Sequence, residues 1–334
     1  MILAIVAGSF AAAWVLVGLT RMIALRAGLI DVPNRRSSHL VPTPRGGGMA
    51  ILLVALCAVA VSTLSGRMPL VAGLSWILGG TVVGIIGLID DIRGLPVALR
   101  MGFQALAAIS LLVATGGLPQ LPMPAGNLEL GYWGWVLGIV VVVWSINLFN
   151  FMDGIDGLAA AQSLFVAGAG ALLVGSVGVA GGLQLPLLAL AGASGGFLVW
   201  NVATTKIFMG DVGSGFIGFS LAASAFLTAG HGSTNLWTWL ALNGLFFADA
   251  TITLLSRWLR GQRVLEAHRS HAYQQLSRRW GSHSAVTLTY SAINVVWCLP
   301  WAIMTTRTPS RGSIFVVAEL LPLSLFALMA GAGK

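Results

Sequence analysis

The sequence has little charge and almost no cysteine, and both shortages limit what the protein can be. Only 8% of its 334 residues are charged, whereas ordinary soluble domains carry about 25%. Its two cysteines, Cys57 and Cys298, each lie inside an apolar run, where we interpret them as small buried hydrophobic residues. The sequence therefore shows no disulfide framework and no cysteine-based metal site, and the shortage of charge disfavours a soluble fold.

What the sequence has instead is apolar runs from end to end. Hydrophobic residues make up 57% of the chain, and the mean hydropathy is +0.90. Because about 20 apolar residues cross a bilayer as a helix, we expect an all-α, polytopic integral membrane protein with about eleven transmembrane helices. The first run is followed by a charged loop and a second run, so we expect it to be retained rather than cleaved as a signal peptide. The expected spans are residues 3–20, 47–65, 69–89, 101–117, 132–150, 158–178, 183–201, 213–229, 236–256, 284–304 and 313–331.

The distribution of basic residues predicts the orientation. With a periplasmic N-terminus, all of the 18 basic residues except Arg67, Arg307 and Arg311 fall on the cytoplasmic side, as the positive-inside rule requires. The odd number of spans then places the C-terminus in the cytoplasm. The net charge of +8 is therefore a topology signal, and we expect no nucleic-acid partner.

The aspartates fall on the same, cytoplasmic side as most of the basic residues, although the positive-inside rule says little about acids. All of them fall in cytoplasmic loops or at cytoplasmic helix ends, which predicts one acidic site facing the cytosol. The aspartates are Asp31, Asp90, Asp91, Asp153, Asp156, Asp211 and Asp249. No repeat or linker divides the chain, so we expect a single domain over residues 1–334. Its active-site loops would lie near residues 21–46, 90–100, 150–158, 202–213 and 257–283.

The most informative loop reads NLFNFMDGIDG, residues 147–157. Its polar residues are Asn147, Asn150, Asp153 and Asp156. They are three residues apart and would share one face of a continuing helix, but the two glycines are expected to break that helix into a tight turn. Oxygen donors at this density suit Mg²⁺ or Mn²⁺, and the carboxylates could also accept N–H groups from a base or sugar.

Two further acidic segments accompany it. The third expected span ends in GLIDDIRGL, with Asp90 and Asp91 at a depth where ionisable groups are costly and usually functional. We weigh metal coordination or a general base against a simple interfacial helix end. Asp211 lies in KIFMGDVGSGF, a Gly-rich loop that opens a helix and so suits an anion. An acid at that place is explained if a divalent cation links it to a phosphate.

Two loops supply cations. The loop DVPNRRSSHLVPTPRGGG is stiffened by prolines and contacts either lipid head groups or a phosphorylated substrate. Its cations are Arg35, Arg36, His39 and Arg45. The longest loop, RWLRGQRVLEAHRSHAYQQLSRRW, is either an amphipathic interfacial helix or a phosphate-binding segment. Its central cations are His268, Arg269 and His271, with too few suitably spaced ligands for zinc. Asp249 either caps a site or pairs with Arg257.

In this order and between spans, DDIRGL, NLFNFMDGIDGLAA, FMGDVGSGF and AHRSHAYQ resemble the polyprenyl-phosphate N-acetylhexosamine-1-phosphate transferases. The resemblance covers about residues 20–285, and NxxNxxDGxDGL together with FMGDxGS is very specific. It implies transfer of a sugar-1-phosphate from a UDP-N-acetyl amino sugar to undecaprenyl phosphate, with release of UMP. It also implies a bacterial inner-membrane enzyme with a cytoplasmic active site and Mg²⁺ dependence, with Mn²⁺ as a substitute.

The same resemblance implies roles for individual residues. Asp156 would contact uracil, and Asp90 and Asp91 would lie near the acceptor phosphate. Arg100 takes the place of a family lysine near the phosphates. The catalytic residues would be Asp90, Asp91, Asp153 and Asp211. The metal ligands would be Asp211 and Asn150. The substrate-binding residues would be Asn147, Asp156, Arg45, Arg100, His268, Arg269 and His271.

One departure narrows the branch of the family. The peptidoglycan member, phospho-MurNAc-pentapeptide translocase, has three consecutive histidines where this sequence reads His268-Arg269-Ser270-His271. The pattern is similar to the branch that starts O-antigen or capsule repeats with UDP-GlcNAc or UDP-linked deoxy amino sugars such as N-acetylfucosamine or N-acetylquinovosamine. The alternatives are the peptidoglycan transferase, a lipid phosphatase and, from another class, an ion-coupled transporter. The sequence leaves monomer and homodimer both open.

Overall fold

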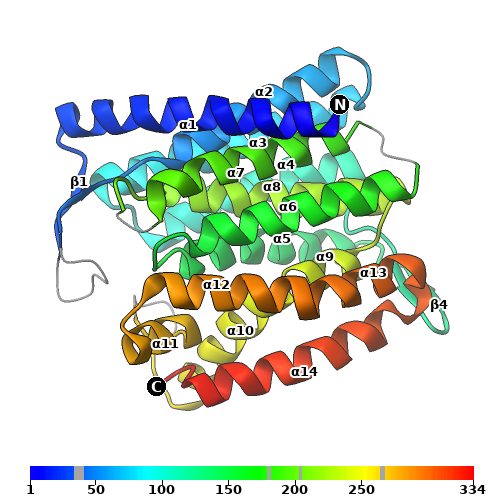
Figure 1. Ribbon diagram of the computed structural model, residues 1–334. Coiled ribbons are helices and arrows are strands. Elements are labelled where there is room, and N and C mark those ends of the chain that lie inside the picture. Colours follow the sequence, from blue (N-terminus) through cyan, green and yellow to red (C-terminus); the bar gives the residue numbers. More distant parts are fainter. Residues whose placement is uncertain (34–40, 179–181, 203–204, 264–267) are drawn as a thin grey trace.

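The computed structural model describes residues 1–33, 41–178, 182–202, 205–263 and 268–334. Helices account for most of these residues, which confirms the expected all-α class. Most of the long helices lie alongside one another across the molecule (Figure 1). The long helices are α1 (Ile2–Ala27), α2 (Gly48–Leu64), α3 (Leu70–Arg93), α4 (Val97–Thr115), α5 (Trp133–Met152), α6 (Leu158–Ser176), α7 (Gln184–Asn201), α8 (Asp211–Gly230), α10 (Gly244–Leu259), α12 (His283–Ile293) and α14 (Gly312–Ala330).

Short elements connect these helices. The short helices are α9 (Leu236–Leu242), α11 (Ala272–Trp280), a π-helical turn (Asn294–Cys298), α13 (Leu299–Arg307) and a 3₁₀ turn (Pro309–Arg311). Two antiparallel hairpins complete the described structure. They are β1 (Ile30–Asp31) with β2 (Thr43–Pro44), and β3 (Leu121–Met123) with β4 (Gly126–Leu128). The β1–β2 hairpin pairs Asp31 with Thr43 and so fixes the start of the first loop beside α2.

Nine of the eleven expected segments each coincide with one helix, whereas 236–256 and 284–304 each cover more than one helical element. Eleven membrane spans are not confirmed. Among the described residues, eight helices are long and apolar enough to cross a membrane, and one bent pair brings the number to nine. That pair is α9 and α10, which meet at 78°, so the span expected at 236–256 is two helices rather than one. Asn243 and Gly244 lie at the break, and both are poor helix formers. The side chain of Asn243 also donates to the carbonyl of Trp239, which its own main-chain N–H needs for the helix.

Helix α8 is the centre of the bundle. Every one of its residues from Val212 to Thr228 is buried, and α2, α3, α4, α5 and α6 all pack against it. In contrast, α1 buries only Ala13, Val17 and Ala24, so most of its apolar surface faces outward. The central position of α8 places its first residue, Asp211, in the middle of one end of the bundle.

Close approach of small residues brings α2 and α3 to that end of α8. A Cβ atom on Gly87 of α3 would lie 2.5 Å from the carbonyl carbon of Asp211. A Cβ atom on Gly48 of α2 would collide with the Cα atom of Gly213. Small residues at helix contacts let backbones approach in this way. As a result, the carboxyl end of α3, which carries Asp90 and Asp91, lies beside the start of α8.

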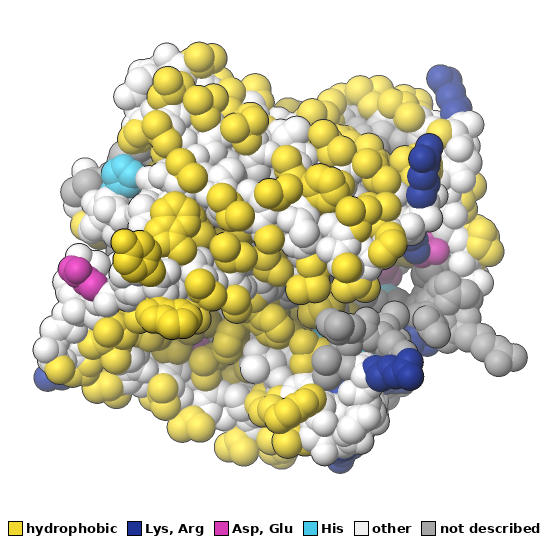
Figure 2. Space-filling model, turned by 180° about the vertical axis from the view of Figure 1, so that it is seen from behind, with side chains coloured by type: hydrophobic (Ala, Val, Ile, Leu, Met, Phe, Trp, Pro, Cys, Tyr) yellow, Lys and Arg dark blue, Asp and Glu magenta, His cyan; other side chains and the backbone are white. Residues whose placement is uncertain are grey.

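The two ends of the molecule differ in charge. In Figure 1, α1 begins at the right, whereas α11 and the C-terminus lie at the left. Figure 2, seen from behind, shows apolar side chains over most of the surface and most of the visible Lys and Arg side chains at the right edge. That edge is the left end of Figure 1. The loops that the sequence marked as functional meet at this charged end.

Candidate active site

A cavity of about 650 Å³ opens at the charged end of the bundle. It is built from segments far apart in the sequence: the β1–β2 hairpin, the end of α3, the α5–α6 turn, residues 208–211 and residues 269–283. Its acidic lining residues are Asp31, Asp91, Asp153, Asp156 and Asp211. Its basic lining residues are Arg45, Arg269, Arg278 and His283. The expected gathering of aspartates is therefore found for five of them.

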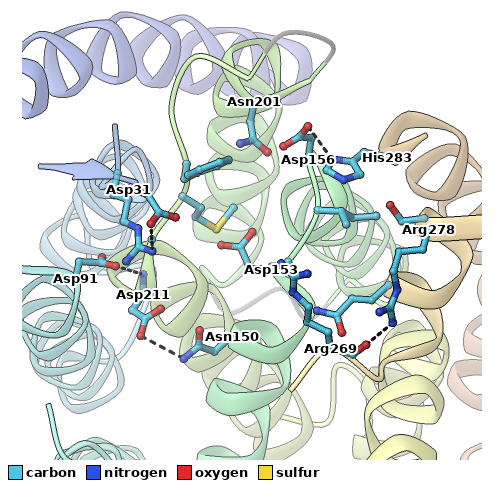
Figure 3. A pocket seen from close by; sticks show the side chains of 18 of the residues that line it. Asp31, Asp91, Asn150, Asp153, Asp156, Asn201, Asp211, Arg269, Arg278 and His283 are labelled. Atoms are coloured by element: carbon cyan, nitrogen blue, oxygen red, sulfur yellow. Dashed lines mark hydrogen bonds and ion pairs between the residues drawn. The ribbon is translucent and has the colours of Figure 1, made fainter. Parts of the chain in front are cut away.

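The cavity has two walls that differ in their charged groups (Figure 3). One side, called the acidic wall below, carries Asp31, Asp91 and Asp211 with the amide of Asn150. The other, called the basic wall, carries Arg269, Arg278 and His283. Asp153 projects between the two walls. Each wall also carries one group of the other sign, Arg45 beside Asp31 and Asp156 beside His283. A ligand that fills the cavity would therefore meet mostly carboxylates on one side and mostly cations on the other.

Asp211 is held in place by Asp91. The carboxylate of Asp91 accepts hydrogen bonds from the main-chain N–H groups of Asp211, at 3.1 Å, and Val212, at 3.2 Å. These N–H groups have no partner within α8, so Asp91 serves as the cap of this helix. The side chain of Asp211 then turns toward α5, with its Oδ2 atom 3.5 Å from Nδ2 of Asn150. The structure thus brings together the two residues expected to bind metal.

Asp90 faces a different direction from its neighbour. Its carboxylate accepts hydrogen bonds from the main-chain N–H of Leu95 and from Nη1 of Arg100, both at 2.5 Å. Arg100 also reaches Oδ2 of Asp211 at 3.3 Å. The expected position of Arg100 near the acidic site is therefore found, although its nearest partner is Asp90. Asp90 supports the start of α4 while Asp91 lines the cavity.

The α5–α6 turn has the expected break. Helix α5 ends at Met152 and α6 begins at Leu158, with Asp153 as the residue that caps α5. Gly157 has a φ of 77°, which favours glycine. Its N–H donates to the side-chain oxygen of Asn201 at 2.7 Å, and the amide of Asn201 donates to the carbonyl of Ile207 at 2.9 Å. Asn201, which the sequence reasoning missed, thus ties this turn to the segment before Asp211.

Charge is concentrated around Asp153. Burial raises the pKa of Asp153 well above its usual range, and the nearby charges of Asp211, Asp91 and Asp156 raise it further. Arg45 offsets part of this charge, and it forms an ion pair with Asp31 at 2.8 Å. Burial works against the charged form of Arg45, but the hydrogen bond and charge of Asp31 outweigh it and raise its pKa. The other cations expected in that loop, Arg35, Arg36 and His39, lie outside the described residues.

The basic wall contains residues that the sequence did not single out. Arg278 of α11 donates from Nη2 to the carbonyl of Arg269 at 2.5 Å, which orders the segment before α11. His283, the first residue of α12, places Nδ1 at 2.9 Å from Oδ2 of Asp156. Asp156 was expected to contact uracil, and its pairing with His283 adds a second polar group at that place. Only the folding of α11 and α12 onto the α5–α6 turn brings these residues to the cavity.

Three expected substrate-binding residues lie behind the lining. His271 is 2% exposed, and its ring stacks on that of His268 with centroids 4.9 Å apart. Its Nδ1 atom lies 3.5 Å from Oδ1 of the buried Asp249. Burial, with His271 and Arg257 nearby, lowers the pKa of His268 to about 4. Asn147 lies one turn inside the bundle and donates to Gln104 at 2.7 Å. A substrate role for these residues stays a prediction.

A second cavity, of about 570 Å³, lies among α5, α8, α9 and α10. Its lining is almost entirely apolar and includes Trp144, Leu148, Ala222, Ala225 and Phe247. We call it the apolar groove. Within the described part of the chain, the indole N–H of Trp144 is buried without a hydrogen-bond partner in this region. The bend between α9 and α10 shapes the groove, because Leu236, Trp239 and Asn243 also line it.

Comparison with known proteins shows to which family this arrangement belongs. Residues 73–229 match the model of glycosyl transferase family 4. The chain is similar to a decaprenyl-phosphate N-acetylglucosaminephosphotransferase of Mycolicibacterium smegmatis, with 32% identity over 86% of this chain and 77% of that protein. It is similar to a probable undecaprenyl-phosphate N-acetylglucosaminyl 1-phosphate transferase of Bacillus subtilis, with 28% identity over 91% and 84% of the two chains.

A third relative carries a different name. The chain is 30% identical to a phospho-N-acetylmuramoyl-pentapeptide-transferase of Moorella thermoacetica, over 82% of this chain and 89% of that protein. The relatives therefore carry two kinds of name, N-acetylglucosamine-phosphate transferase and pentapeptide transferase. Since the matches extend over most of the chain and include relatives above 30% identity, this protein belongs to glycosyl transferase family 4.

Proposed function

We propose that the protein transfers an N-acetylhexosamine-1-phosphate from a UDP-sugar to a polyprenyl phosphate, with release of UMP. The observation that carries the proposal is the single cavity in which Asp211, Asn150 and Asp153 face Arg269 and Arg278. The names of the relatives, which are polyprenyl-phosphate sugar-phosphate transferases and pentapeptide transferases, support the same reaction class. The proposed acceptor is undecaprenyl phosphate, and the proposed place is the bacterial inner membrane.

The charges of the cavity suit a reaction in which two polyanions, the lipid phosphate and the diphosphate of the UDP-sugar, must meet. The reaction forms a bond between an oxygen of the lipid phosphate and the sugar-proximal phosphorus, and it breaks the bond from that phosphorus to UMP. Such phosphoryl transfer depends mainly on positioning and on stabilising charge. Arg269 and Arg278 would hold the diphosphate, since one guanidinium group can donate two parallel hydrogen bonds to phosphate oxygens. Because a phosphate monoester has a second pKa of about 6, the attacking oxygen needs little help from a base at neutral pH.

The donor groups of the acidic wall fit Mg²⁺. Among the described residues, the structure has no cluster of three or more His, Cys, Asp or Glu side chains arranged around one point. Mg²⁺, however, is usually held by one or two carboxylates together with water and substrate phosphates. Asp211 with the amide of Asn150 would supply protein oxygens, and Asp153 lies close enough to Asp211 for their charges to interact. Bound there, the ion would neutralise diphosphate charge and fix its orientation.

The apolar groove would take the prenyl chain of the acceptor. A long hydrocarbon chain needs an apolar surface that is open to the bilayer, and the lining of this groove is almost free of polar atoms. Leu148 and Trp144 of α5 line it, and the same helix carries Asn150 into the active-site cavity. A lipid lying along α5 would therefore have its phosphate end near the cavity. This arrangement explains why the enzyme is embedded in a membrane.

The orientation follows from the charged end of the bundle. We propose that the cavity faces the cytoplasm, with a periplasmic N-terminus and a cytoplasmic C-terminus. The gathering of Lys and Arg at the end that carries the cavity supports this, because basic residues mark the cytoplasmic side (Figure 2). UDP-sugars are made in the cytosol, so a cavity on that side would meet its donor there.

The donor we favour is UDP-GlcNAc, since two of the relatives are named for N-acetylglucosamine. UDP-linked deoxy amino sugars of O-antigen or capsule synthesis are the next choice on the sequence pattern. The alternative is UDP-MurNAc-pentapeptide, which one relative's name suggests. His268-Arg269-Ser270-His271 in place of three consecutive histidines argues against it.

A donor screen tests the proposal. Purified protein in detergent, undecaprenyl phosphate and Mg²⁺ would be incubated with each UDP-sugar in turn, and UMP release would be measured. We expect release with one donor, and its loss with EDTA and in Asp211→Ala. Glu129→Gln is the matched control, because Glu129 is exposed and follows β4, outside the cavity lining. Folded, lipid-bound protein that neither binds a UDP-sugar nor releases UMP would overturn the proposal in favour of a transporter.

A further inference from the structure

Tyr273 connects the two walls of the cavity. It lies in the first turn of α11 and is fully buried. Its hydroxyl donates to the main-chain carbonyl of Phe151 at 2.9 Å. Phe151 belongs to the last turn of α5, where carbonyls have no partner within the helix. The side chain of Tyr273 therefore supplies a hydrogen-bond donor to the last turn of α5. This helix carries Asn150, and Asp153 follows directly after it.

Both ends of Tyr273 are fixed. Its main-chain N–H and that of Ala272 donate to the carboxylate of Asp249, at 3.0 and 2.8 Å. Asp249 is 1% exposed and also accepts from the hydroxyl of Tyr290 at 2.8 Å. Burial, with the charges of Asp249 and Asp153, raises the pKa of Tyr273 well above 10, so its hydroxyl stays a donor at neutral pH. Asp249 thus fixes the start of α11, and the phenol fixes its distance from α5.

Gly154 leaves no spare room at this contact. A Cβ atom on Gly154 would collide with the hydroxyl oxygen of Tyr273 and lie 3.1 Å from its Cζ atom. It would also lie 3.2 Å from Nε2 of Gln274, which lines the cavity. The turn that holds Asp153 and the helix that holds Gln274 and Arg278 therefore touch at a point where one methyl group would force them apart.

We infer that the contact of Tyr273 with Phe151 and Gly154 sets the separation of the acidic and basic walls, which makes Tyr273 a positioning residue. The inference rests on the proposed function, because the two walls would hold the reacting phosphates. Tyr273 touches neither substrate; it acts through Asn150 and Asp153 on one side and Gln274 and Arg278 on the other. An error of about 1 Å in such placement can cost about a hundredfold in rate.

The test is a set of four variants measured for UMP release and melting temperature. Gly154→Ala should lower kcat about a hundredfold, because the new methyl group displaces α11. Tyr273→Phe should lower kcat about tenfold and change the KM for the donor by less than about threefold, because it alters alignment rather than contacts. The double variant should be about tenfold more active than Gly154→Ala, because removal of the hydroxyl makes room for the methyl group.

Tyr290→Phe is the matched control, because it also removes a buried tyrosine hydroxyl, here one that donates to Asp249 and does not line the cavity. It should lower the melting temperature as much as Tyr273→Phe but change kcat by less than about twofold. The inference is overturned if the double variant is no better than Gly154→Ala, or if Tyr290→Phe loses as much kcat as Tyr273→Phe.

The failure of the proposed function would look different. In that case the wild-type protein releases no UMP from any donor. The contact of Tyr273 with Phe151 and Gly154 is then tested by melting temperatures alone. Gly154→Ala should then melt lowest, and the double variant should melt above it. An equal or lower melting temperature for the double variant would overturn the inference whatever the activity of the protein is.

Discussion

The carboxylate of Asp91 accepts a hydrogen bond from the main-chain N–H of Asp211, with 3.1 Å between the two atoms. A residue at the end of α3 thereby fixes the first turn of the most buried helix in the protein. The paired aspartates of the sequence have different surroundings as a result. Asp91 caps α8 within the cavity, whereas Asp90 is bound to Arg100 and Leu95.

This capping predicts a difference between two substitutions of Asp91. Asp91 uses one oxygen for each of the two N–H groups, so asparagine, which has a single acceptor oxygen, can keep one of these hydrogen bonds and alanine keeps neither. We expect Asp91→Ala to lower the melting temperature more than Asp91→Asn does, because each lost hydrogen bond leaves a main-chain N–H of α8 without its partner. If capping is the main role of Asp91, Asp91→Asn should also keep UMP release within about tenfold. A loss of a thousandfold in a stable Asp91→Asn protein would assign it the role of base instead.

Removal of the carboxylate of Asp211 should stop the reaction without unfolding the protein. Loss of one charge-stabilising group costs about a hundredfold to a thousandfold in rate. We expect Asp211→Asn to lose UMP release by at least this factor and to need more Mg²⁺ for what remains. A titration of UMP release against Mg²⁺ concentration checks this. An Asp211→Asn protein with wild-type Mg²⁺ dependence would contradict its role in the acidic wall.

The pairing of His283 with Asp156 predicts that the two act as a unit. Their side chains are 2.9 Å apart and both line the cavity. Residues in contact show interaction energies of about 0.5–3 kcal/mol in double-mutant cycles. We expect His283→Gln and Asp156→Asn each to raise the KM for the UDP-sugar, and the double variant to raise it no more than the worse single one. Effects that multiply in the double variant would show that the two act independently.

The low pKa of His268 predicts a weaker fold in mild acid. Its folded value of about 4 lies below the value of about 6.5 expected in an unfolded chain. Between these values the unfolded chain binds the extra proton, so the free energy of unfolding falls as the pH drops from 6.5 toward 4. We expect the melting temperature to fall less over this range in His268→Gln. An equal fall in wild type and variant would locate the acid sensitivity elsewhere.

A bulky residue in the apolar groove should act on the acceptor alone. Ala222 of α8 lines the groove, so Ala222→Phe would fill part of it. We expect the KM for undecaprenyl phosphate to rise several-fold, while a short-chain acceptor such as farnesyl phosphate is unaffected. Ala12→Phe on the outward face of α1 is the control. An equal effect on both acceptors would show that the groove does not hold the chain.

The sequence predicts much of the acidic half of the site. The resemblance to the family implied that Asn150 and Asp211 meet, and the glycines of NLFNFMDGIDG indicated where α5 ends. These signals are local, because helix breakers act on their own neighbours. The broken helix at Asn243 was missed because apolar residues continue on both sides of it and were interpreted as one span, although the dipeptide Asn243-Gly244 is itself a turn signal.

The rest of the site depends on contacts between distant elements. Asn147 and Asn150 are equally polar in the sequence, yet only Asn150 reaches the cavity, because Asn147 finds Gln104 inside the bundle. His283 reaches Asp156 only because α12 returns to the α5–α6 turn. In helices that are apolar on every face, composition does not say which face meets a neighbour. Such partners are found from the fold and not from the pattern.

The two walls of the cavity come from separate stretches of the chain. The acidic wall is complete by residue 211, and the basic wall begins at residue 269. Residues 73–229, which match the family model, contain most of the first and none of the second. Substitutions within residues 268–283 can therefore reshape the basic wall, which we propose meets the nucleotide-sugar, while Asp31, Asp91 and Asp211 stay unchanged. We expect new donor preferences to evolve by exchange of this one short segment. The exchange must keep a residue such as Tyr273, which holds the segment at its distance from α5.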